Sequence, residues 1–251
     1  MYSFLKKMYK MVRTFYHDMK RYAKVNWVKT IYFNFKKFPF KTAKKLPVFF
    51  YGKVSFQSIK GEIIIQSPIK KGMIGFGKRF EKFSRSKGIA EICLEGKLIF
   101  KGYAMFGQDY LIYIAEYACL EVGNFSGMGS DCKIACSQYI KLGNNVRISY
   151  ESQILDSNFH QMIDTQSGER IPLASPIIIG NNNFIGNRTT IMPKTITPDF
   201  CTISSNSLSN RDYTLLGTNI LIGGVPAKLI KTNISRDWDS EKDNLDIWYK
   251  V

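Results

Sequence analysis

Aliphatic residues recur every six positions through the second half of the chain. The repeated positions, in order, are Val122, Met128, Ile134, Leu142, Ile148, Ile154, Ile179, Ile185, Ile191 and Ile203. The period is broken twice, by two extra residues between Ile134 and Leu142 and by a longer interruption between Ile154 and Ile179. Thr197 occupies the one repeated position that is not aliphatic. Many short strands would otherwise suggest a sandwich or barrel, but an internal repeat takes precedence over that interpretation.

The residue after each repeated position is mostly small. These residues are Gly123, Gly129, Ala135, Gly143, Ser149, Gly180, Gly186 and Ser204. A six-residue unit is one short strand and one turn, so three units close a triangular coil of about eighteen residues. Stacked coils bury a continuous apolar column, into which Ile148 and Ile185 should point. Asn144-Asn145 and the run at 181–183 supply the left-handed backbone values that corners need.

The N-terminal part has a different pattern. Apolar residues at helical spacing predict an amphipathic helix over residues 2–24. Residues 25–47 are aromatic and basic, and Pro39 and Pro47 predict that any helices there are short. Short β-branched runs begin near residue 48, for example at 62–65, 92–96 and 97–102. We therefore expect a helical extension over 1–47, a β-helix over 48–235 and a tail over 236–251.

Charge separates these regions further. The net charge is +16, and residues 1–47 hold thirteen basic residues against one acidic residue, Asp18. A basic segment with an apolar stripe indicates peripheral contact with an anionic membrane. The same stripe could instead pack on the β-helix or on a neighbouring subunit. The aromatic residues could also stack on nucleic-acid bases, but the main body carries no recognition motif.

Composition narrows the remaining possibilities. No apolar run is long enough for a membrane-spanning helix, and the N-terminus lacks the apolar centre of a secretory signal, so a cytoplasmic location is expected. The five cysteines are odd in number and lack zinc-ligand spacing. We expect reduced thiols that fill small inward positions, and no metal site.

Three segments resemble a known family. Residues 177–187 read IIIGNNNFIGN, residues 223–231 read GGVPAKLIK, and residues 156–160 read DSNFH. The first two resemble the late coils and closing signature of hexapeptide-repeat acetyltransferases. The third is similar to the catalytic segment of the sugar O-acetyltransferase branch, which includes galactoside, maltose, capsule and lipopolysaccharide acetyltransferases. The resemblance covers roughly residues 60–235. Two departures are Phe184, where the family often has Trp, and residues 203–211, which lack its Gly-rich, Thr-Lys pattern.

The resemblance implies a left-handed parallel β-helix that transfers an acetyl group from acetyl-CoA to a sugar hydroxyl of a surface polysaccharide precursor. An alcohol needs a base to attack a thioester, and an imidazole can take that proton near neutral pH. The chain has two histidines, His17 in the basic extension and His160 in the family-like segment. His160 is therefore the expected base. Asp156 could orient its ring, or could instead be a corner residue that binds backbone.

The resemblance also implies where coenzyme A binds. Position by position, it places on the cofactor path Asn187, Ser205, Asn210, Arg211, Lys228 and Lys231. No Ser or Cys lies in an elbow-like context, so direct transfer without an acyl-enzyme is expected. A lone β-helix offers no deep pocket, so a homotrimer with three sites between subunits is expected. The polar segment 161–176 should reach over the acceptor or the next subunit.

Other functions remain less compatible with the sequence. A zinc-dependent β-helix hydratase needs several histidines, whereas the repeat region has one. A structural or ice-binding β-helix would show flat arrays of Thr or Ser on one face, and the sequence has no such arrays. An N-acetyltransferase acting on a nucleotide-linked amino sugar keeps the same family and cofactor, and the sequence does not separate it from the O-acetyltransferase.

Overall fold

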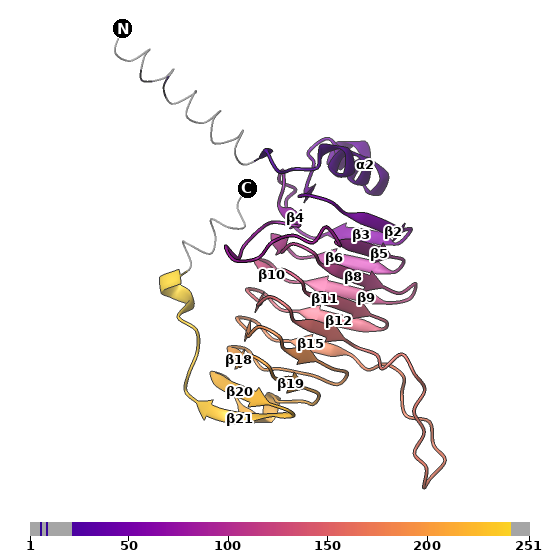
Figure 1. Cartoon of the computed structure of the whole chain (residues 1–251), viewed down its shortest axis with the longest axis vertical. Helices are drawn as coiled ribbons and strands as arrows, with labels where there is room; N and C mark the ends of the chain where they lie inside the picture. The colour runs from indigo at the N-terminus through magenta and orange to yellow at the C-terminus, as the bar shows by residue number, and fades with distance from the viewer. Residues whose placement is uncertain (1–5, 7–8, 10–21, 242–251) are drawn as a thin grey trace.

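The computed structural model describes residues 6, 9 and 22–241. The amphipathic helix predicted for residues 2–24 therefore lies almost entirely outside the described residues. The remainder of the chain winds into a stack of short strands, with the N-terminal helices at one end (Figure 1).

The strands form three sheets that the chain visits in turn. The nine-stranded sheet contains, in spatial order, β1 (Val48–Phe50), β4 (Ile74–Phe76), β7 (Ala104–Phe106), β10 (Ser126–Met128), β13 (Arg147–Ile148), β16 (Phe184–Ile185), β18 (Cys201–Ile203), β20 (Ile220–Gly224) and β21 (Ala227–Thr232). The seven-stranded sheet contains β2 (Ser55–Ile59), β5 (Glu91–Leu94), β8 (Leu111–Ile114), β11 (Lys133–Cys136), β14 (Gln153–Leu155), β17 (Thr190–Ile191) and β19 (Leu208–Ser209). The five-stranded sheet contains β3 (Glu62–Ile65), β6 (Lys97–Phe100), β9 (Cys119–Val122), β12 (Tyr139–Leu142) and β15 (Ile177–Ile179).

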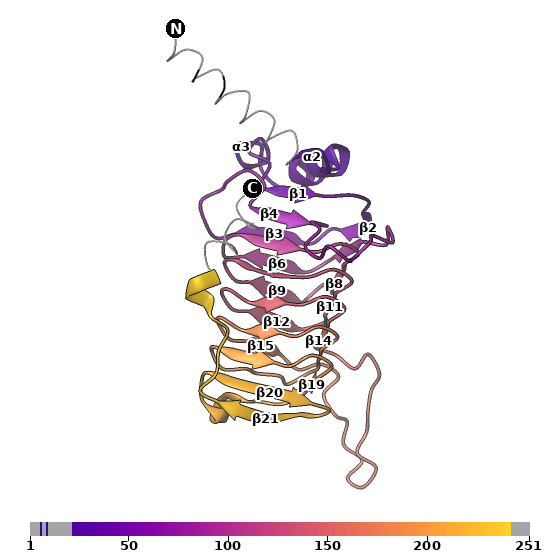
Figure 2. The ribbon, with the colours of Figure 1, turned by 60° about the vertical axis from the view of Figure 1, so that its left-hand side comes forward.

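Strand pairing makes this stack a parallel β-helix. Each strand pairs in parallel with the strand one coil away, as in Gly127↔Arg147 and Arg147↔Phe184. The exception is β21, which turns back antiparallel on β20 and ends the sheet. Two views of the stack show the coils lying one above another along a single axis (Figure 2). The fold class predicted from the repeat and the resemblance, a left-handed parallel β-helix with an N-terminal helical extension, is confirmed.

The predicted column is the core of this coil. All ten repeated aliphatic residues and Thr197 are buried, with Ile148 the most exposed at 4 %. The small residues that follow them lie where neighbouring coils touch, because a Cβ on Gly143 would lie 2.7 Å from the carbonyl carbon of Gly180. Asn145 and Asn182 adopt φ values of 56° and 53°, as predicted for the corners.

Aromatic rings replace the aliphatic residues at the N-terminal end of the column. Phe50, Phe76 and Phe106 occupy successive registered positions, and Phe76 stacks on Phe106 with ring centroids 4.6 Å apart. Helices α2 (Trp27–Lys37) and α3 (Phe40–Ala43) cover this end. Phe33 of α2 packs on Phe50, with ring centroids 4.9 Å apart. The predicted short helices are confirmed, because Pro39 separates α2 from α3.

Candidate functional site

His160 lies on an arm that leaves the coil after β14. The arm occupies the corner between the seven- and five-stranded sheets, and isolated antiparallel bridges join Ser157 to Ala174 and Ile163 to Arg170. It projects away from the stack at the lower right of Figure 1. The His160 side chain is exposed, and no hydrogen bond among the described residues involves its ring. The imidazole is therefore open to a substrate or to another chain.

Apolar side chains accompany the histidine on this arm. The exposed fractions are 52 % for Phe159, 53 % for Met162 and 53 % for Ile163. The sequence suggested that segment 161–176 is polar, and its exposed apolar residues were not anticipated. The arm therefore exposes three large apolar side chains next to the histidine.

Asp156 lies at the corner of the coil where the arm begins. Its side chain is buried, and its carboxylate accepts backbone N–H bonds from Ser137 at 2.7 Å, Gln138 at 2.9 Å and Tyr139 at 2.8 Å. Among the described residues, no hydrogen bond joins Asp156 to His160. These three bonds give Asp156 the corner role, one of the two roles that the sequence allowed, and they hold the preceding coil.

The residues predicted to contact coenzyme A fall into three groups. Asn187 and Ser205 lie together at the corner between the nine- and seven-stranded sheets, where Ser205 Oγ donates to Asn187 Oδ1 at 2.6 Å. Asn210 and Arg211 follow β19, at the same corner as the arm but two strands further along. Arg211 Nη2 donates to the Ala227 carbonyl at 3.0 Å, so this side chain also holds the last turn.

The third group is on the terminal hairpin. Lys228 and Lys231 are exposed on β21, opposite Gly223 and Leu221 of β20. Strand β21 lies at the far end of the stack from α2 (Figure 1). In one chain the six predicted residues therefore line two corners and the end of the coil, and do not converge on His160.

A pocket of about 300 Å³ lies on the outward face of the nine-stranded sheet. Gly127, Arg147 and Phe184, which are in register on three successive strands, form its floor, and Phe80 and Arg236 contribute from segments that cross the sheet. The Arg236 guanidinium lies 5.0 Å from the ring centroids of both Phe184 and Trp238. Of these residues, Phe184 alone stood out in the sequence as a possible site residue, and Phe80 and Arg236 come from segments outside the repeat pattern.

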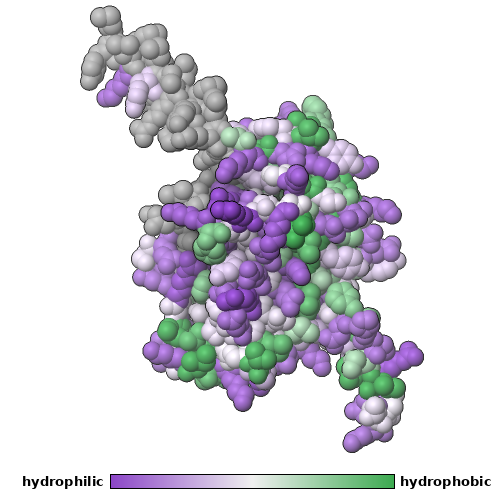
Figure 3. Space-filling view, in the orientation of Figure 1, coloured by the Kyte–Doolittle hydropathy of each residue, from purple (hydrophilic) through white to green (hydrophobic). Residues whose placement is uncertain are grey.

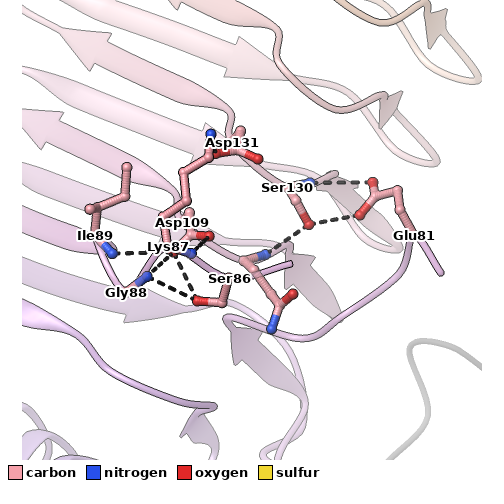
Figure 4. A network of polar contacts seen from close by, with 9 residues as sticks. Glu81, Ser86, Lys87, Gly88, Ile89, Asp109, Ser130 and Asp131 are labelled. Atoms are coloured by element: carbon pink, nitrogen blue, oxygen red, sulfur yellow. Dashed lines mark hydrogen bonds and ion pairs between the residues drawn. The ribbon is translucent and has the colours of Figure 1, made fainter. Parts of the chain in front are cut away.

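A polar network fixes one wall of this pocket. Residues 77–90 connect β4 to β5, and Figure 4 shows how their side chains and backbone meet the neighbouring corner. The Asp109 carboxylate accepts from the backbone N–H of Lys87 at 2.7 Å and of Gly88 at 3.0 Å. Ser130 Oγ donates to Glu81 at 2.7 Å, so the insertion that supplies Phe80 and Glu81 is anchored at both ends.

Histidine and pocket lie on opposite sides of one chain. The arm leaves the corner between the seven- and five-stranded sheets, whereas the pocket lies on the nine-stranded sheet, the side of the triangle that does not meet that corner. A ligand cannot contact both in one chain without spanning the coil.

The cysteine thiols are unsuited to nucleophilic chemistry. Burial raises the pKa of Cys132 and of Cys201 to about 12. Burial also raises the pKa of Cys93, Cys119 and Cys136. All five are therefore protonated near neutral pH, and a protonated thiol is a poor nucleophile.

No protein-family model matches the chain, and no curated protein sequence matches it. Its structure is similar to several solved structures of hexapeptide-repeat acetyltransferases and related acyltransferases. The polySia-specific acetyltransferase NeuO is 17 % identical over 81 % of this chain and 86 % of its own, with a TM-score of 0.47. A maltose O-acetyltransferase from Clostridium difficile 630 is 26 % identical over 55 % and 67 %, with a TM-score of 0.38. AntD, an N-acyltransferase from Bacillus cereus solved with dTDP and coenzyme A, is 13 % identical over 84 % and 98 %, with a TM-score of 0.44.

Proposed function

We propose that this chain is an acetyl-CoA-dependent acyltransferase that acetylates a sugar hydroxyl of a bacterial surface polysaccharide precursor. The observation that carries the proposal is the His160 imidazole, which is exposed and unpaired among the described residues on an arm that leaves a rigid coil. A general base must reach the proton that it removes, and a projecting imidazole can approach a hydroxyl that a buried one cannot.

The proposed reaction is a direct transfer. The acceptor hydroxyl attacks the thioester carbonyl carbon while His160 takes the hydroxyl proton. The carbon–sulfur bond then breaks, and the departing thiolate takes that proton from the imidazolium. The raised thiol pKa values support this route over a cysteine acyl-enzyme, because a thiolate would be needed to form one.

The assembly proposed for this reaction is a homotrimer. His160 and the Phe184 pocket lie on opposite sides of one chain, so a cyclic arrangement would bring the arm of one subunit to the nine-stranded sheet of the next. The exposed apolar residues of the arm support such a contact. Phe184 would then supply an apolar wall beside the acyl donor.

The cofactor assignment follows from the same arrangement. We propose that Asn187 and Ser205 bind the pantetheine part of acetyl-CoA, and that Asn210, Arg211, Lys228 and Lys231 lie along its path to the phosphates. The three basic side chains are exposed and suit phosphate, which binds guanidinium and ammonium groups strongly. A cytoplasmic location, with peripheral membrane contact through residues 1–47, is proposed from the charge of that segment.

Replacement of His160 tests the proposal. His160→Ala should lower kcat by about a hundredfold or more, since general-base catalysis contributes effects of that size. The measurement is release of free coenzyme A from acetyl-CoA with saturating acceptor. His17→Ala is the matched control, because it removes the chain's other imidazole and should leave kcat unchanged. An unchanged kcat for His160→Ala would refute the base assignment.

The acceptor class needs its own experiment. The parent protein should turn over acetyl-CoA with an oligosaccharide acceptor, and mass and NMR spectra should show an O-linked acetyl group. Turnover confined to nucleotide-linked amino sugars, with an amide product, would replace the O-acetyl proposal by the N-acetyl one.

A further inference from the structure

The outward face of α2 is apolar, although no described part of the chain covers it. Val28 is 79 % exposed, Phe35 and Ile31 are each 47 % exposed, and Phe40 at the start of α3 is 71 % exposed. Val28, Ile31 and Phe35 are spaced by three and four residues, so they form one stripe along the helix. The opposite face packs on the β-helix through Thr30, Phe33 and Asn34. Helix α2 is therefore buried on its inner side and carries exposed apolar residues on its outer side.

Lysines surround this stripe without acidic partners. Residues 19–61 contain eleven basic residues and no acidic residue. The exposed lysines at this end include Lys24, Lys36, Lys41, Lys44 and Lys45, and none of them takes part in an ion pair between described residues. The loop from β3 to β4 adds Lys71, whose Nζ lies 4.4 Å from the Tyr22 ring centroid. Figure 3 shows green apolar residues among purple polar ones at this upper end of the molecule.

We propose that the outward face of α2 and α3 binds the surface of an anionic lipid bilayer. An apolar stripe bordered by lysines matches the boundary between acyl chains and anionic headgroups, where amphipathic helices lie in the plane of the membrane. Among the described residues, no helix is long and apolar enough to cross a bilayer. The contact proposed here is therefore peripheral, and it specifies which side chains make the membrane contact proposed above.

The strand order also separates the arm that carries His160 from the end covered by α2 and α3. In the seven-stranded sheet, β14 is four strands from β2, and strands lie about 4.8 Å apart, so the arm begins about 20 Å below the capped coil. A chain bound through α2 with its axis upright therefore holds His160 away from the headgroups. Lipid binding should consequently leave turnover of a soluble acceptor unchanged.

Vesicle co-sedimentation of the full chain tests the proposal. The vesicles are phosphatidylcholine alone or phosphatidylcholine with about one third phosphatidylglycerol. The parent should bind the anionic vesicles, bind the neutral ones at least about tenfold more weakly, and be released as salt is raised. Val28→Glu/Phe35→Glu should lower binding about tenfold, because it places carboxylates where the stripe meets lipid. Lys41→Gln/Lys44→Gln/Lys45→Gln should remove much of the salt dependence.

Controls separate this contact from the alternatives. Leu215→Glu changes a fully exposed apolar residue at the other end of the stack and should bind vesicles like the parent. Trp27, in a Trp238→Phe/Trp248→Phe background, should be quenched by brominated lipid. The proposal is wrong if the Val28→Glu/Phe35→Glu variant binds vesicles as tightly as the parent. It is also wrong if this variant changes the particle mass but not lipid binding, which would indicate a contact between subunits. Binding of the parent to oligonucleotides without binding to vesicles would likewise contradict it. Failure of acetyl transfer with vesicle binding intact would instead count against the proposed function.

Discussion

The inward column and the corner between the seven- and five-stranded sheets are made by the same six-residue repeat, but they tolerate change differently. The column runs from Phe50 and Phe76 at one end to Ile203 and Ile222 at the other, so its registered positions hold both aromatic and aliphatic residues. The corner is a two-residue turn at Ser137-Gln138 and a long projecting arm one coil later. Residues at the inward positions remain buried from coil to coil. The corner, by contrast, accommodates a long loop in one coil and a two-residue turn in the coil before it.

Asp156 and His160 show that difference within five residues. Asp156 still belongs to the coil, because its carboxylate holds the backbone of the preceding turn. His160 lies beyond the point where the chain leaves the coil and touches no hydrogen-bonding partner among the described residues. The residue proposed as the base therefore lies just beyond the exit of the arm, and the last coil residue before that exit has a structural role.

Charge inside the column should produce the largest effect. Ile179→Asp should destabilise the protein by more than about 4 kcal/mol, because it buries an unpaired carboxylate at a fully buried position. Ile178→Asp is the matched control, since the neighbouring side chain of the same strand points outward and is only partly buried. Its cost should be much smaller. Urea unfolding of the two variants measures the difference, and equal losses would show that the inward register is wrong.

Substitutions at Asp156 and at His160, on either side of the exit of the arm, should change the free energy of unfolding by different amounts. Asp156→Ala should lower the free energy of unfolding by about 1–3 kcal/mol, because it removes a buried carboxylate that accepts three backbone N–H bonds. His160→Ala should change it by less than about 0.5 kcal/mol, as expected for an exposed side chain. Thermal and urea unfolding provide the measurement. A stable Asp156→Ala protein with an altered pH dependence of kcat would restore the orienting role.

The smallest expected effect is a loss of stability at high pH that arises from ionisation of the buried cysteines. The folded-state pKa of Cys132 is about 12 and an ordinary thiol titrates near 9.0, so the unfolded chain loses its proton first as the pH rises. Stability is therefore complete below about pH 9 and declines from there towards pH 12, by about 1 kcal/mol per thiol between pH 9 and 10. Urea unfolding at both pH values should show a shallower decline for Cys132→Ala than for the parent. The half-exposed Cys93 is the control, and Cys93→Ala should change the decline less. Equal slopes in all three proteins would contradict the burial of Cys132.

Much of the coil could be predicted because its physics is local. Aliphatic residues at a period of six, followed by small residues, identify both the inward face and the points where coils touch. Asn145 and Asn182 identified corners because their side chains tolerate the left-handed backbone. Phe125 and Phe200 adopt the same conformation at φ values of 54° and 57°, and nothing in their residue type signals it. Their coil imposes that conformation on them.

The candidate site could be predicted only in part. His160 was identifiable because it is the single histidine of the repeat region and lies in a family-like segment. The pocket was not, since Phe80, Arg147 and Arg236 are far apart in sequence and meet only when the insertion and the tail cross the nine-stranded sheet. The insertion is held there by Asp109 and Ser130, which are contributed by later coils.

By itself the sequence determined the column, the exit of the arm and the concentration of positive charge near the N-terminus, because each depends on residues close together in the chain. The tertiary structure decided which surroundings each of these features has. Burial of the Asp156 carboxylate, the outward direction of the α2 stripe and the placement of His160 opposite the Phe184 pocket all depend on which coil lies above which. Those arrangements are set by contacts between residues many positions apart in the sequence, beyond what the six-residue pattern specifies.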